Sequence, residues 1–378
     1  MSCPVEFLRQ LAVEGQLRIQ RPLDSPTGVR VMREGRELWN FASNDYLGLA
    51  QHPEVVSALM EGVRSFGAGA AASRLICGTF SPHRLLEDAL AEAKQTEAAL
   101  TFSSGFATAM GVIPAVVGKS DFIFLDKLSH ACLVDAARLS GSTIRVFPHN
   151  DVARLKKLLI STRAKFAHSR ILVVTESVFS MDGDTCPLRA IIELTESHQA
   201  LLLLDEAHGF GVLGKHGMGL AEQENLQQRI TFQMGTLSKS AGLAGGYLAA
   251  SRAWIDYFIN CARSFIYSTA PPPALAHAAI HSLALIRSDE GRRLRAKLQE
   301  SIARFSSQGT PIVPIMLGSS QAVISAASFL EERGLMVGAI RYPTVARGAG
   351  RLRISLSANH TLEATNQLAS ALASLPTQ

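Results

Sequence analysis

The chain has 378 residues, of which 47% are hydrophobic and 18% are charged, and this composition is typical of a packed globular protein and excludes a disordered one. The net charge of +5 is compatible with an anionic substrate, but the basic residues are too dispersed to indicate a nucleic-acid-binding protein. No apolar run reaches the roughly 18 residues that cross a bilayer, and Met1–Gln20 lacks a signal pattern, so we expect a cytoplasmic protein without a membrane anchor. The five cysteines form no Cys-x-x-Cys pair, so we expect neither a disulfide framework nor a metal site.

Short apolar segments alternate with helical patterns through the first two thirds of the chain. This alternation predicts an α/β protein with a mostly parallel sheet covered by helices, because parallel neighbours need long crossover connections. The expected strands are Ala99–Ser103, Phe122–Leu125, Ile144–Phe147, Ile171–Thr175, Leu201–Asp205, Thr231–Met234 and Gly246–Ala250. The expected helices between them are Arg84–Gln95, Phe106–Val117, Leu133–Leu139, Val152–Leu159 and Leu188–His198.

The pattern changes after the proline-rich segment Ala270–Pro273, where two long helices are predicted before further short apolar runs. These helices are Leu275–Ile286 and Glu290–Arg304, and the runs are Pro311–Met316, Met336–Arg341 and Leu352–Leu356. We therefore predict an N-terminal segment over residues 1–40, a large domain over residues 41–280 and a smaller α/β domain over residues 281–378.

Two segments imitate nucleotide-binding motifs. Gly67–Ala72 has the letters of a dinucleotide fingerprint, but it follows a helical pattern instead of a strand. Gly209–Lys215 has the spacing of a phosphate loop, but His216 stands where a Ser or Thr should bind magnesium. The sequence therefore argues against nucleotide hydrolysis and hydride transfer.

A third constellation predicts a pyridoxal phosphate site. Lys239 follows Thr236 in a Ser-rich turn, and its amine could form an imine with an aldehyde. Asp205 ends an apolar strand, where its carboxylate could keep a pyridine nitrogen protonated, and His208 could hydrogen-bond the phenolic oxygen. Each residue alone has a plain alternative, as a solvated lysine, a helix cap or a histidine bonded to a backbone carbonyl.

Two further strand ends supply candidates. Ser103–Phe106 ends one apolar run and opens a helical one, so free N–H groups there could bind phosphate or could be capped by serine. His130 follows the run Phe122–Leu125 and could stack on a cofactor ring, although a lone histidine is often structural.

The order of these motifs resembles the α-oxoamine synthase family, whose members are fold type I pyridoxal phosphate enzymes. The resemblance runs nearly from end to end of the chain. Its motifs are Asn40–Leu49, Ser73–Leu75 with Gly78 and His83, Ser129–His130, His149–Asp151, Ser177–Asp184, Asp205–Gly209, Thr236–Lys239, Phe265–Thr269, Ile340–Val345 and Arg351–Arg353.

The resemblance implies roles for four side chains near the cofactor ring. Lys239 would bind pyridoxal 5'-phosphate covalently and transfer protons, and Asp205 would pair with the pyridine nitrogen. His130 would stack on the ring and His208 would contact the phenolic oxygen.

It also implies how the phosphate is held. Gly105, Phe106 and Thr236 would bind the phosphate in the same subunit, whereas Ser268 and Thr269 would reach the phosphate of the neighbouring subunit. A homodimer with shared active sites is therefore implied.

The substrate contacts that the resemblance implies lie elsewhere in the chain. Asn44 and Arg353 would bind the carboxylate of the amino acid, and Ser180 would line the site. The plain alternative for Arg353 is a solvated charge on an alternating strand.

Within the family, Ser43–Tyr46, His149–Val152 and Ile340–Val345 resemble the branch that acts in biotin biosynthesis. That branch condenses L-alanine with pimeloyl-CoA, or pimeloyl-acyl-carrier protein, and releases CO2 to give 8-amino-7-oxononanoate. The alternative is a sibling activity such as glycine C-acetyltransferase, which uses glycine and acetyl-CoA. Tyr342 stands where proline is common, so the contacts with the acyl chain are left open.

Overall fold

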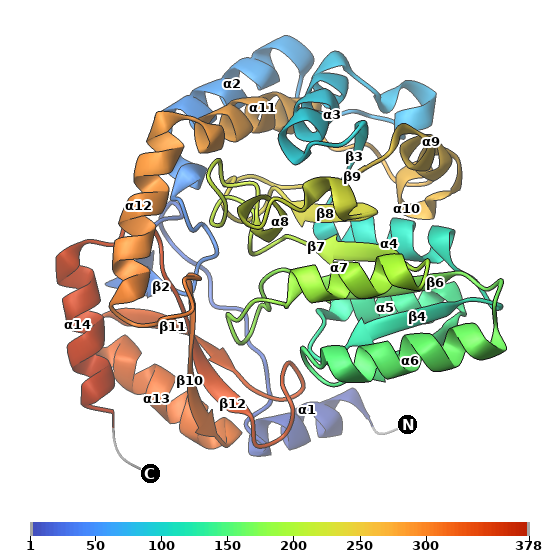
Figure 1. Cartoon of the computed structure of the whole chain (residues 1–378). Coiled ribbons are helices and arrows are strands. Elements are labelled where there is room, and N and C mark those ends of the chain that lie inside the picture. Colours follow the sequence, from blue (N-terminus) through green and yellow to red (C-terminus); the bar gives the residue numbers. More distant parts are fainter. Residues whose placement is uncertain (1–2, 376–378) are drawn as a thin grey trace. The chain divides into compact units, whose positions relative to one another are not determined.

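The computed structural model (Figure 1) describes residues 3–375. These residues form two compact units. The larger unit consists of residues 52–180 and 184–295, and the smaller unit consists of residues 3–51, 181–183 and 296–375. This division differs from the expected domains at both boundaries. Residues 3–40 belong to the smaller unit, because two strands formed by residues 30–41 extend its sheet. The second boundary falls after Arg295 instead of residue 280, because α11 (Pro273–Arg287) packs on helices of the larger unit.

The larger unit is built on a seven-stranded sheet that matches all seven expected strands. The order is β3-β9-β8-β7-β6-β4-β5, and β9 runs antiparallel to both of its neighbours while the remaining pairs are parallel. The prediction of a mostly parallel sheet is therefore confirmed. The strands are β3 (Ala98–Phe102), β4 (Phe122–Asp126), β5 (Thr143–Phe147), β6 (Ile171–Glu176), β7 (Leu201–Asp205), β8 (Phe232–Thr236) and β9 (Gly246–Ala250).

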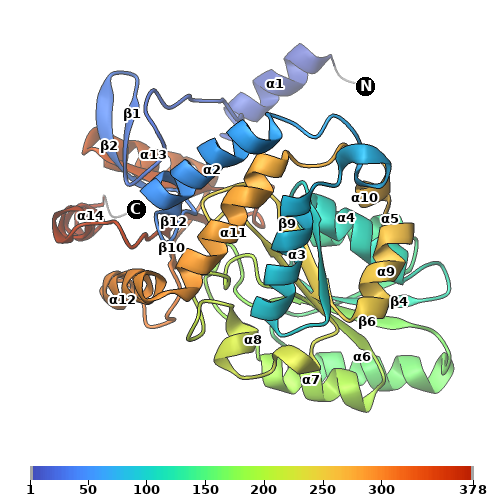
Figure 2. The same cartoon turned by 90° about the horizontal axis from the view of Figure 1, so that it is seen from above.

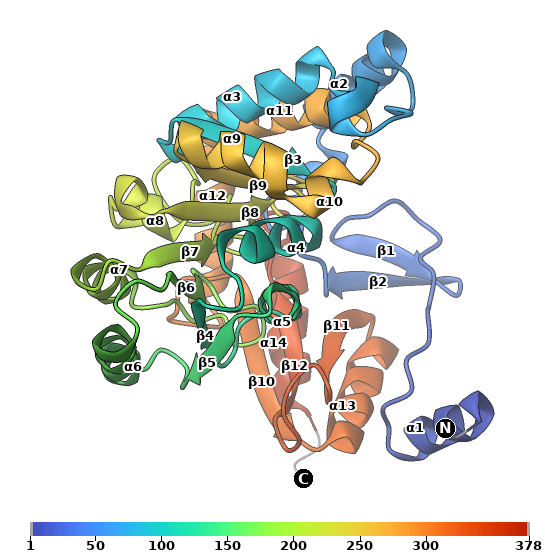
Figure 3. The same cartoon turned by 90° about the vertical axis from the view of Figure 1, so that its right-hand side faces the viewer.

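Helices cover both faces of this sheet, and Figure 3 shows α6 and α7 on one face and α4 and α5 on the other. Burial on both faces explains why the central strands are continuous apolar runs and not alternating ones. The helices of this unit are α2 (Pro53–Phe66), α3 (Ser81–Lys94), α4 (Gly105–Val116), α5 (Ala131–Ser140), α6 (Val152–Lys165), α7 (Leu188–Ser197), α8 (Leu220–Gln223), α9 (Arg252–Cys261), α10 (Arg263–Ile266) and α11. Helices α2, α11 and α3 lie side by side (Figure 2).

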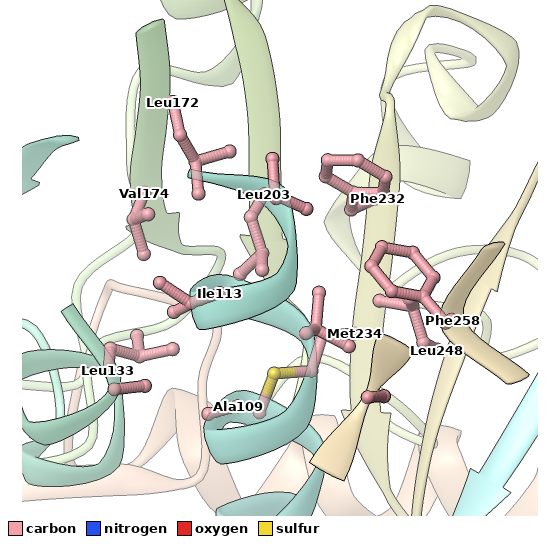
Figure 4. Close-up of a cluster of buried hydrophobic side chains, with 14 of the residues drawn as sticks. Ala109, Ile113, Leu133, Leu172, Val174, Leu203, Phe232, Met234, Leu248 and Phe258 are labelled. Atoms are coloured by element: carbon pink, nitrogen blue, oxygen red, sulfur yellow. The ribbon is translucent and has the colours of Figure 1, made fainter. Parts of the chain in front are cut away.

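A core of fully buried side chains lies between the sheet and α4, α5 and α9 (Figure 4). Leu172 and Val174 of β6 point to this side, as do Leu203 of β7 and Phe232 and Met234 of β8. These alternate strand positions face the same helices because successive side chains in a strand point to opposite faces. The core holds the strand ends, and therefore the residues that follow them, in fixed positions.

The smaller unit contains a five-stranded sheet with the order β1-β2-β11-β12-β10, in which β2 and β11 are parallel and the other pairs antiparallel. Its strands are β1 (Arg30–Arg33), β2 (Arg36–Phe41), β10 (Ile312–Gly318), β11 (Leu335–Ile340) and β12 (Gly350–Ser355). Its helices are α1 (Pro4–Val13), α13 (Ser320–Glu332) and α14 (Leu362–Ala373), and α12 (Asp289–Ala303) crosses the boundary between the units. The 3-10 helix η1 (Leu49–Gln51) also belongs to this unit, whereas the π-helix η2 (Arg74–Gly78) and the 3-10 helix η3 (Gln227–Arg229) belong to the larger unit. Over residues 3–375, no helix combines the length and the apolar character needed to span a membrane.

Candidate active site

The residues predicted to hold the cofactor ring converge at one edge of the larger sheet. Glu176 ends β6, Asp205 ends β7 and Thr236 ends β8, so their side chains meet at the carboxyl edge where ligands bind in open α/β sheets. A cavity of about 200 Å³ lies at this edge. It is lined by Ser104, Gly105, Phe106, His130, Cys132, Glu176, Asp205, Ala207, His208, Met234, Thr236, Ser238 and Lys239.

Lys239 lies on the turn that follows β8, and its amine contacts His208. The distance from Lys239 Nζ to His208 Nε2 is 2.7 Å. The turn is held by the N–H of Gly242, which donates to the carbonyl of Lys239, and by the pairing of Leu237 with Gly245. In this contact one nitrogen donates a hydrogen bond and the other accepts it, so either His208 Nε2 or the Lys239 amine must have a free lone pair. The amine is thus placed in the cavity beside a group that can exchange a proton with it.

Asp205 is a buried acid at the base of the cavity and is 5% exposed. Its Oδ1 accepts a hydrogen bond of 2.9 Å from the N–H of Ala207. Burial raises the pKa of Asp205, whereas the charge of Lys239 and the hydrogen bond from Ala207 lower it. A cationic partner at this position would favour the ionised carboxylate, because an opposite charge offsets the cost of burial.

His130 caps α5 and presents a neutral ring to the cavity. Its Nδ1 accepts a hydrogen bond of 3.2 Å from the N–H of Cys132. Burial lowers the pKa of His130, and the nearby charge of Lys239 lowers it further, while Asp205 acts in the opposite direction. A neutral imidazole whose Nδ1 accepts carries its proton on Nε2 and has a flat face that can stack on an aromatic ligand.

Glu176 is a site residue that the sequence analysis missed. It is 3% exposed, and its carboxyl oxygen accepts the backbone N–H of His130. Burial and the neighbouring charge of Asp205 raise the pKa of Glu176 to about 8, so this acid is largely protonated near neutral pH. Its signal in the sequence was its position directly after the apolar run of β6, which is the position that Asp205 has after β7.

The beginning of α4 forms a cradle that suits a phosphate. The hydroxyl of Ser104 accepts the N–H of Ala107 at 3.0 Å and caps the helix. The first N–H groups of α4, at Gly105 and Phe106, have no acceptor within the helix and face the cavity with the positive end of the helix dipole. The hydroxyl of Thr236 lies close by, since a Cβ placed on Gly105 would be 3.8 Å from Thr236 Oγ1.

These features fit pyridoxal phosphate on chemical grounds. The cavity combines an amine, a buried acid and a helix N-terminus, which match the aldehyde, the ring nitrogen and the phosphate of that cofactor. Lys239, Asp205, His208, His130, Gly105, Phe106 and Thr236 are therefore brought together as the sequence analysis expected.

Five predicted site residues do not line this cavity, and three of them belong to the larger unit. Ser180 is buried in the segment after β6, and Ser268 and Thr269 lie at the surface of the larger unit after α10. Thr269 forms an isolated antiparallel bridge with Ser73. The role predicted for Ser268 and Thr269 concerns a second subunit, so it stays a prediction.

Asn44 and Arg353 belong to the smaller unit, which brings them into contact. Arg353 Nη1 donates to Asn44 Oδ1 at 2.9 Å and to Ser355 Oγ at 2.8 Å, and Arg353 is 6% exposed. The hydroxyl of Tyr46 also donates to Asn44 Oδ1, at 3.2 Å. The exposed charge considered as an alternative for Arg353 is therefore wrong, and its role toward a substrate carboxylate stays a prediction.

Comparisons with known proteins identify the relatives of this chain. The aminotransferase class I and II family matches residues 36–372. An 8-amino-7-oxononanoate synthase from Nitrosospira multiformis is 43% identical over 376 residues, which are 97% of this chain and 94% of that protein. A serine palmitoyltransferase from S. paucimobilis, solved with PLP and myriocin bound, has a TM-score of 0.89 at 27% identity and covers 97% of this chain and 95% of its own. The 8-amino-7-oxononanoate synthase from Francisella tularensis has a TM-score of 0.76 at 28% identity, with 89% and 96% covered.

Proposed function

The chain belongs to the aminotransferase class I and II family and, within it, to the 8-amino-7-oxononanoate synthases, and from this premise we propose that it joins L-alanine to a pimeloyl thioester. The protein is a pyridoxal-phosphate-dependent acyltransferase. In the proposed reaction, pimeloyl-CoA or pimeloyl-acyl-carrier protein gives up its acyl group, CO2 is released, and 8-amino-7-oxononanoate is formed for biotin biosynthesis. The cytoplasm stays the predicted location.

The observation that carries the proposal is the contact between Lys239 and His208 beside the buried Asp205. When bound, pyridoxal phosphate supplies an electron sink that stabilises negative charge on the α-carbon of an amino acid. Lys239 Nζ is the group placed to remove and return the α-proton, and His208 Nε2 lies within reach to exchange a proton with it.

The remaining side chains of the cavity orient the cofactor. Asp205 would hold a proton on the ring nitrogen, because a buried carboxylate favours a cation next to it. The N–H groups of Gly105 and Phe106 and the hydroxyl of Thr236 would bind the phosphate, and the ring of His130 would cover one face.

Arg353 is proposed to bind the carboxylate of alanine together with Asn44. Its guanidinium is buried and already held by oxygens of Asn44 and Ser355, so its orientation is fixed before a substrate arrives. A planar guanidinium can bind a carboxylate through two parallel hydrogen bonds.

We also propose that the protein is a homodimer in which Ser268 and Thr269 complete the phosphate site of the neighbouring subunit. Both residues lie at the surface of the larger unit and not at its own cavity. Tyr267 precedes Ser268, and Ile76 belongs to the turn after Ser73, which pairs with Thr269; these two apolar side chains are 71% and 81% exposed and would be covered by a partner.

A substrate panel tests the proposed reaction. The purified protein should be yellow, lose its colour on borohydride reduction, and form 8-amino-7-oxononanoate and CO2 from L-alanine with pimeloyl-CoA or pimeloyl-acyl-carrier protein. The variant Lys239→Ala is the control and should form no product above background. Higher activity with glycine and acetyl-CoA would move the assignment to glycine C-acetyltransferase, and a colourless protein would favour a binding module without catalysis.

A further inference from the structure

His149 holds two carboxylates at the carboxyl edge of the larger sheet. Its Nδ1 lies 3.0 Å from Asp126 Oδ1 and its Nε2 lies 2.7 Å from Asp184 Oδ2. Strand pairing places Asp126 beside Phe147, so the chain needs only two more residues to bring the ring of His149 to this carboxylate. His149 is 24% exposed, whereas Asp126 is buried.

All three residues of the motif His149–Asp151 have defined contacts in this arrangement. Asn150 adopts a left-handed backbone conformation with φ of 56°, which asparagine tolerates better than most residues. Its backbone N–H donates to Asp126 Oδ2 at 2.8 Å and its side-chain amide donates to Asp184 Oδ2 at 3.0 Å. The carboxylate of Asp151 caps α6 by accepting the N–H of Arg154 at 2.8 Å.

The first carboxylate, Asp126, also organises the turn that carries His130. Its Oδ1 accepts the N–H of Leu128 at 2.8 Å, and its carbonyl accepts the N–H of Ser129 at 3.1 Å. These bonds fix the path of residues 127–130 from the end of β4 to the first turn of α5. His130 stands at the end of that path, where its backbone N–H also binds Glu176.

The second carboxylate, Asp184, closes the segment that follows Glu176. Its carbonyl accepts the N–H of Phe179 at 3.0 Å, and Val178 pairs with Thr185 in an isolated bridge. The ring of Phe179 packs edge-on against His149, with centroids 4.3 Å apart. The segment after β6 is thus tied to the same histidine as the turn after β4.

We propose that His149 is a positioning residue, whose ring holds Asp126 and Asp184 together and so fixes the two segments that place His130 and Glu176 at the cofactor cavity. The inference deepens the proposed function, because His130 matters in this way only if the cavity binds pyridoxal phosphate. His149 itself does not line the cavity. It acts on the cofactor site indirectly, because it binds Asp126, which in turn holds the turn of residues 127–130.

The charge of the ring agrees with this geometry. Burial lowers the pKa of His149, but the hydrogen bonds to Asp126 and Asp184 outweigh this effect and raise it to about 10. The ring is therefore a cation at neutral pH and can donate from both nitrogens, one to each carboxylate. Nitrogen-15 NMR of the imidazole rings should find one histidine that stays protonated above pH 9, and this signal should be absent in His149→Gln.

The test compares cofactor binding in His149→Gln and Asp184→Asn with His168→Gln, which makes the same chemical change at an exposed histidine in the loop after α6. We expect the dissociation of pyridoxal phosphate from the holoenzyme to be roughly tenfold faster in His149→Gln, because small misplacements at a site have effects of this size or larger. Asp184→Asn should show a smaller effect of the same sign. The visible circular dichroism of the bound cofactor should change in both variants and not in His168→Gln.

A purely structural role predicts a different pattern. A lower urea midpoint for His149→Gln, with unchanged cofactor dissociation and unchanged visible circular dichroism, would overturn the proposal. If His149→Gln does not fold, Asp184→Asn decides, and an unaltered cofactor signal there overturns it as well. A wild-type protein that binds the cofactor but forms no product would contradict the proposed reaction alone, since these readouts need no thioester.

Discussion

Glu176 and Asp205 lie opposite each other at the ends of neighbouring strands, and burial acts on both acids in the same direction. Strand pairing places their Cα atoms in register at the edge of the cavity. Burial raises the pKa of each acid, and the charge of Asp205 raises the pKa of Glu176 further. Two adjacent buried carboxylates are rarely both ionised, so we infer that Asp205 carries the charge and Glu176 the proton when a cation occupies the site.

The pKa of Glu176 predicts a pH dependence of stability. In the unfolded chain this carboxyl titrates near 4.5, whereas in the folded protein its pKa is about 8. Between these values the unfolded chain has released a proton that the folded protein retains, so the free energy of unfolding falls as the pH rises from about 5 to 8. Replacement by glutamine keeps an oxygen that can accept the N–H of His130 but removes the titrating group.

We therefore expect cofactor-free Glu176→Gln to lose less stability than the wild type over this pH range. Urea unfolding at several pH values measures the difference. Glu196→Gln is the matched control, because Glu196 is an exposed acid paired with Arg229 and should leave the wild-type slope in place. Parallel slopes for the wild type and Glu176→Gln would show that Glu176 titrates normally.

Asp205→Asn tests the charge assigned to the other acid. Asparagine can still accept the N–H of Ala207, but it cannot stabilise a proton on a ring nitrogen. The protein should still bind pyridoxal phosphate, whereas the exchange of the α-proton of L-alanine with deuterated water should slow by roughly 100- to 1000-fold, the usual effect of losing a preorganised electrostatic group. Proton NMR of alanine follows this exchange without any thioester. An exchange rate equal to that of the wild type would contradict the proposal that Asp205 stabilises the proton on the ring nitrogen.

At the scale of elements, the close approach of α4 to β9 shapes the phosphate cradle. A Cβ placed on Gly246 would lie 2.5 Å from the backbone nitrogen of Gly105 and from the backbone of Ser104. Only glycine at this position lets the first turn of the helix reach the strand. The N–H groups of that turn are held beside Thr236 as a result.

Gly246→Ala should therefore displace the beginning of α4. We expect a loss of about 1 to 3 kcal/mol in the free energy of unfolding, as is usual for overpacking a buried contact, and weaker binding of pyridoxal phosphate. Urea unfolding and a cofactor titration measure the two effects. Gly118→Ala is the control, because a Cβ there meets no atom within 4 Å. Equal cofactor affinity in both variants would argue against the cradle.

The apolar pattern of each strand decided whether the sequence could predict it. The strands of the larger sheet were found because burial on both faces requires unbroken apolar runs, and the residues at their carboxyl ends could then be placed at one edge. Strands β1 and β2 were missed, because their arginines and glutamate hide the pattern and β2 pairs with β11, some 300 residues later. Glu176 was missed because its one signal, a position directly after an apolar run, does not reveal the contact with His130 that the fold creates.

At the scale of the whole molecule, the sequence alone could not divide the chain. Residues 3–51 and 296–375 form one unit although the larger unit separates them, and such pairing of distant segments leaves no local pattern. The motif His149–Asp151 was recognised by resemblance. Its contacts with Asp126, at the end of β4, and with Asp184, in the segment after β6, form only when the sheet brings these distant residues together. Local patterns therefore predict elements, while the assembly of the sites depends on long-range contacts.

The proposed dimer with shared sites makes the last prediction, which concerns two copies of the chain. Lys239→Ala removes the reactive amine but leaves Ser268 and Thr269 able to serve a partner. A second variant, Ser268→Ala with Thr269→Ala, keeps Lys239 but supplies no phosphate contact to its neighbour. Each variant alone should be nearly inactive, whereas a heterodimer of the two contains one complete site.

Mixing equal amounts under conditions that allow subunits to exchange should make half of the dimers mixed, each with one of two sites intact. The activity should then recover to about a quarter of the wild-type value for the same total protein, as the two-fold symmetry of a dimer requires. Steady-state rates measure the recovery, and sedimentation velocity checks that dimers form. Mixing Lys239→Ala with the wild type is the control and should give about half of the wild-type rate for the same total protein, because each wild-type subunit keeps a complete site with either partner. A mixture no more active than the sum of its parts would mean that each site is complete within one chain.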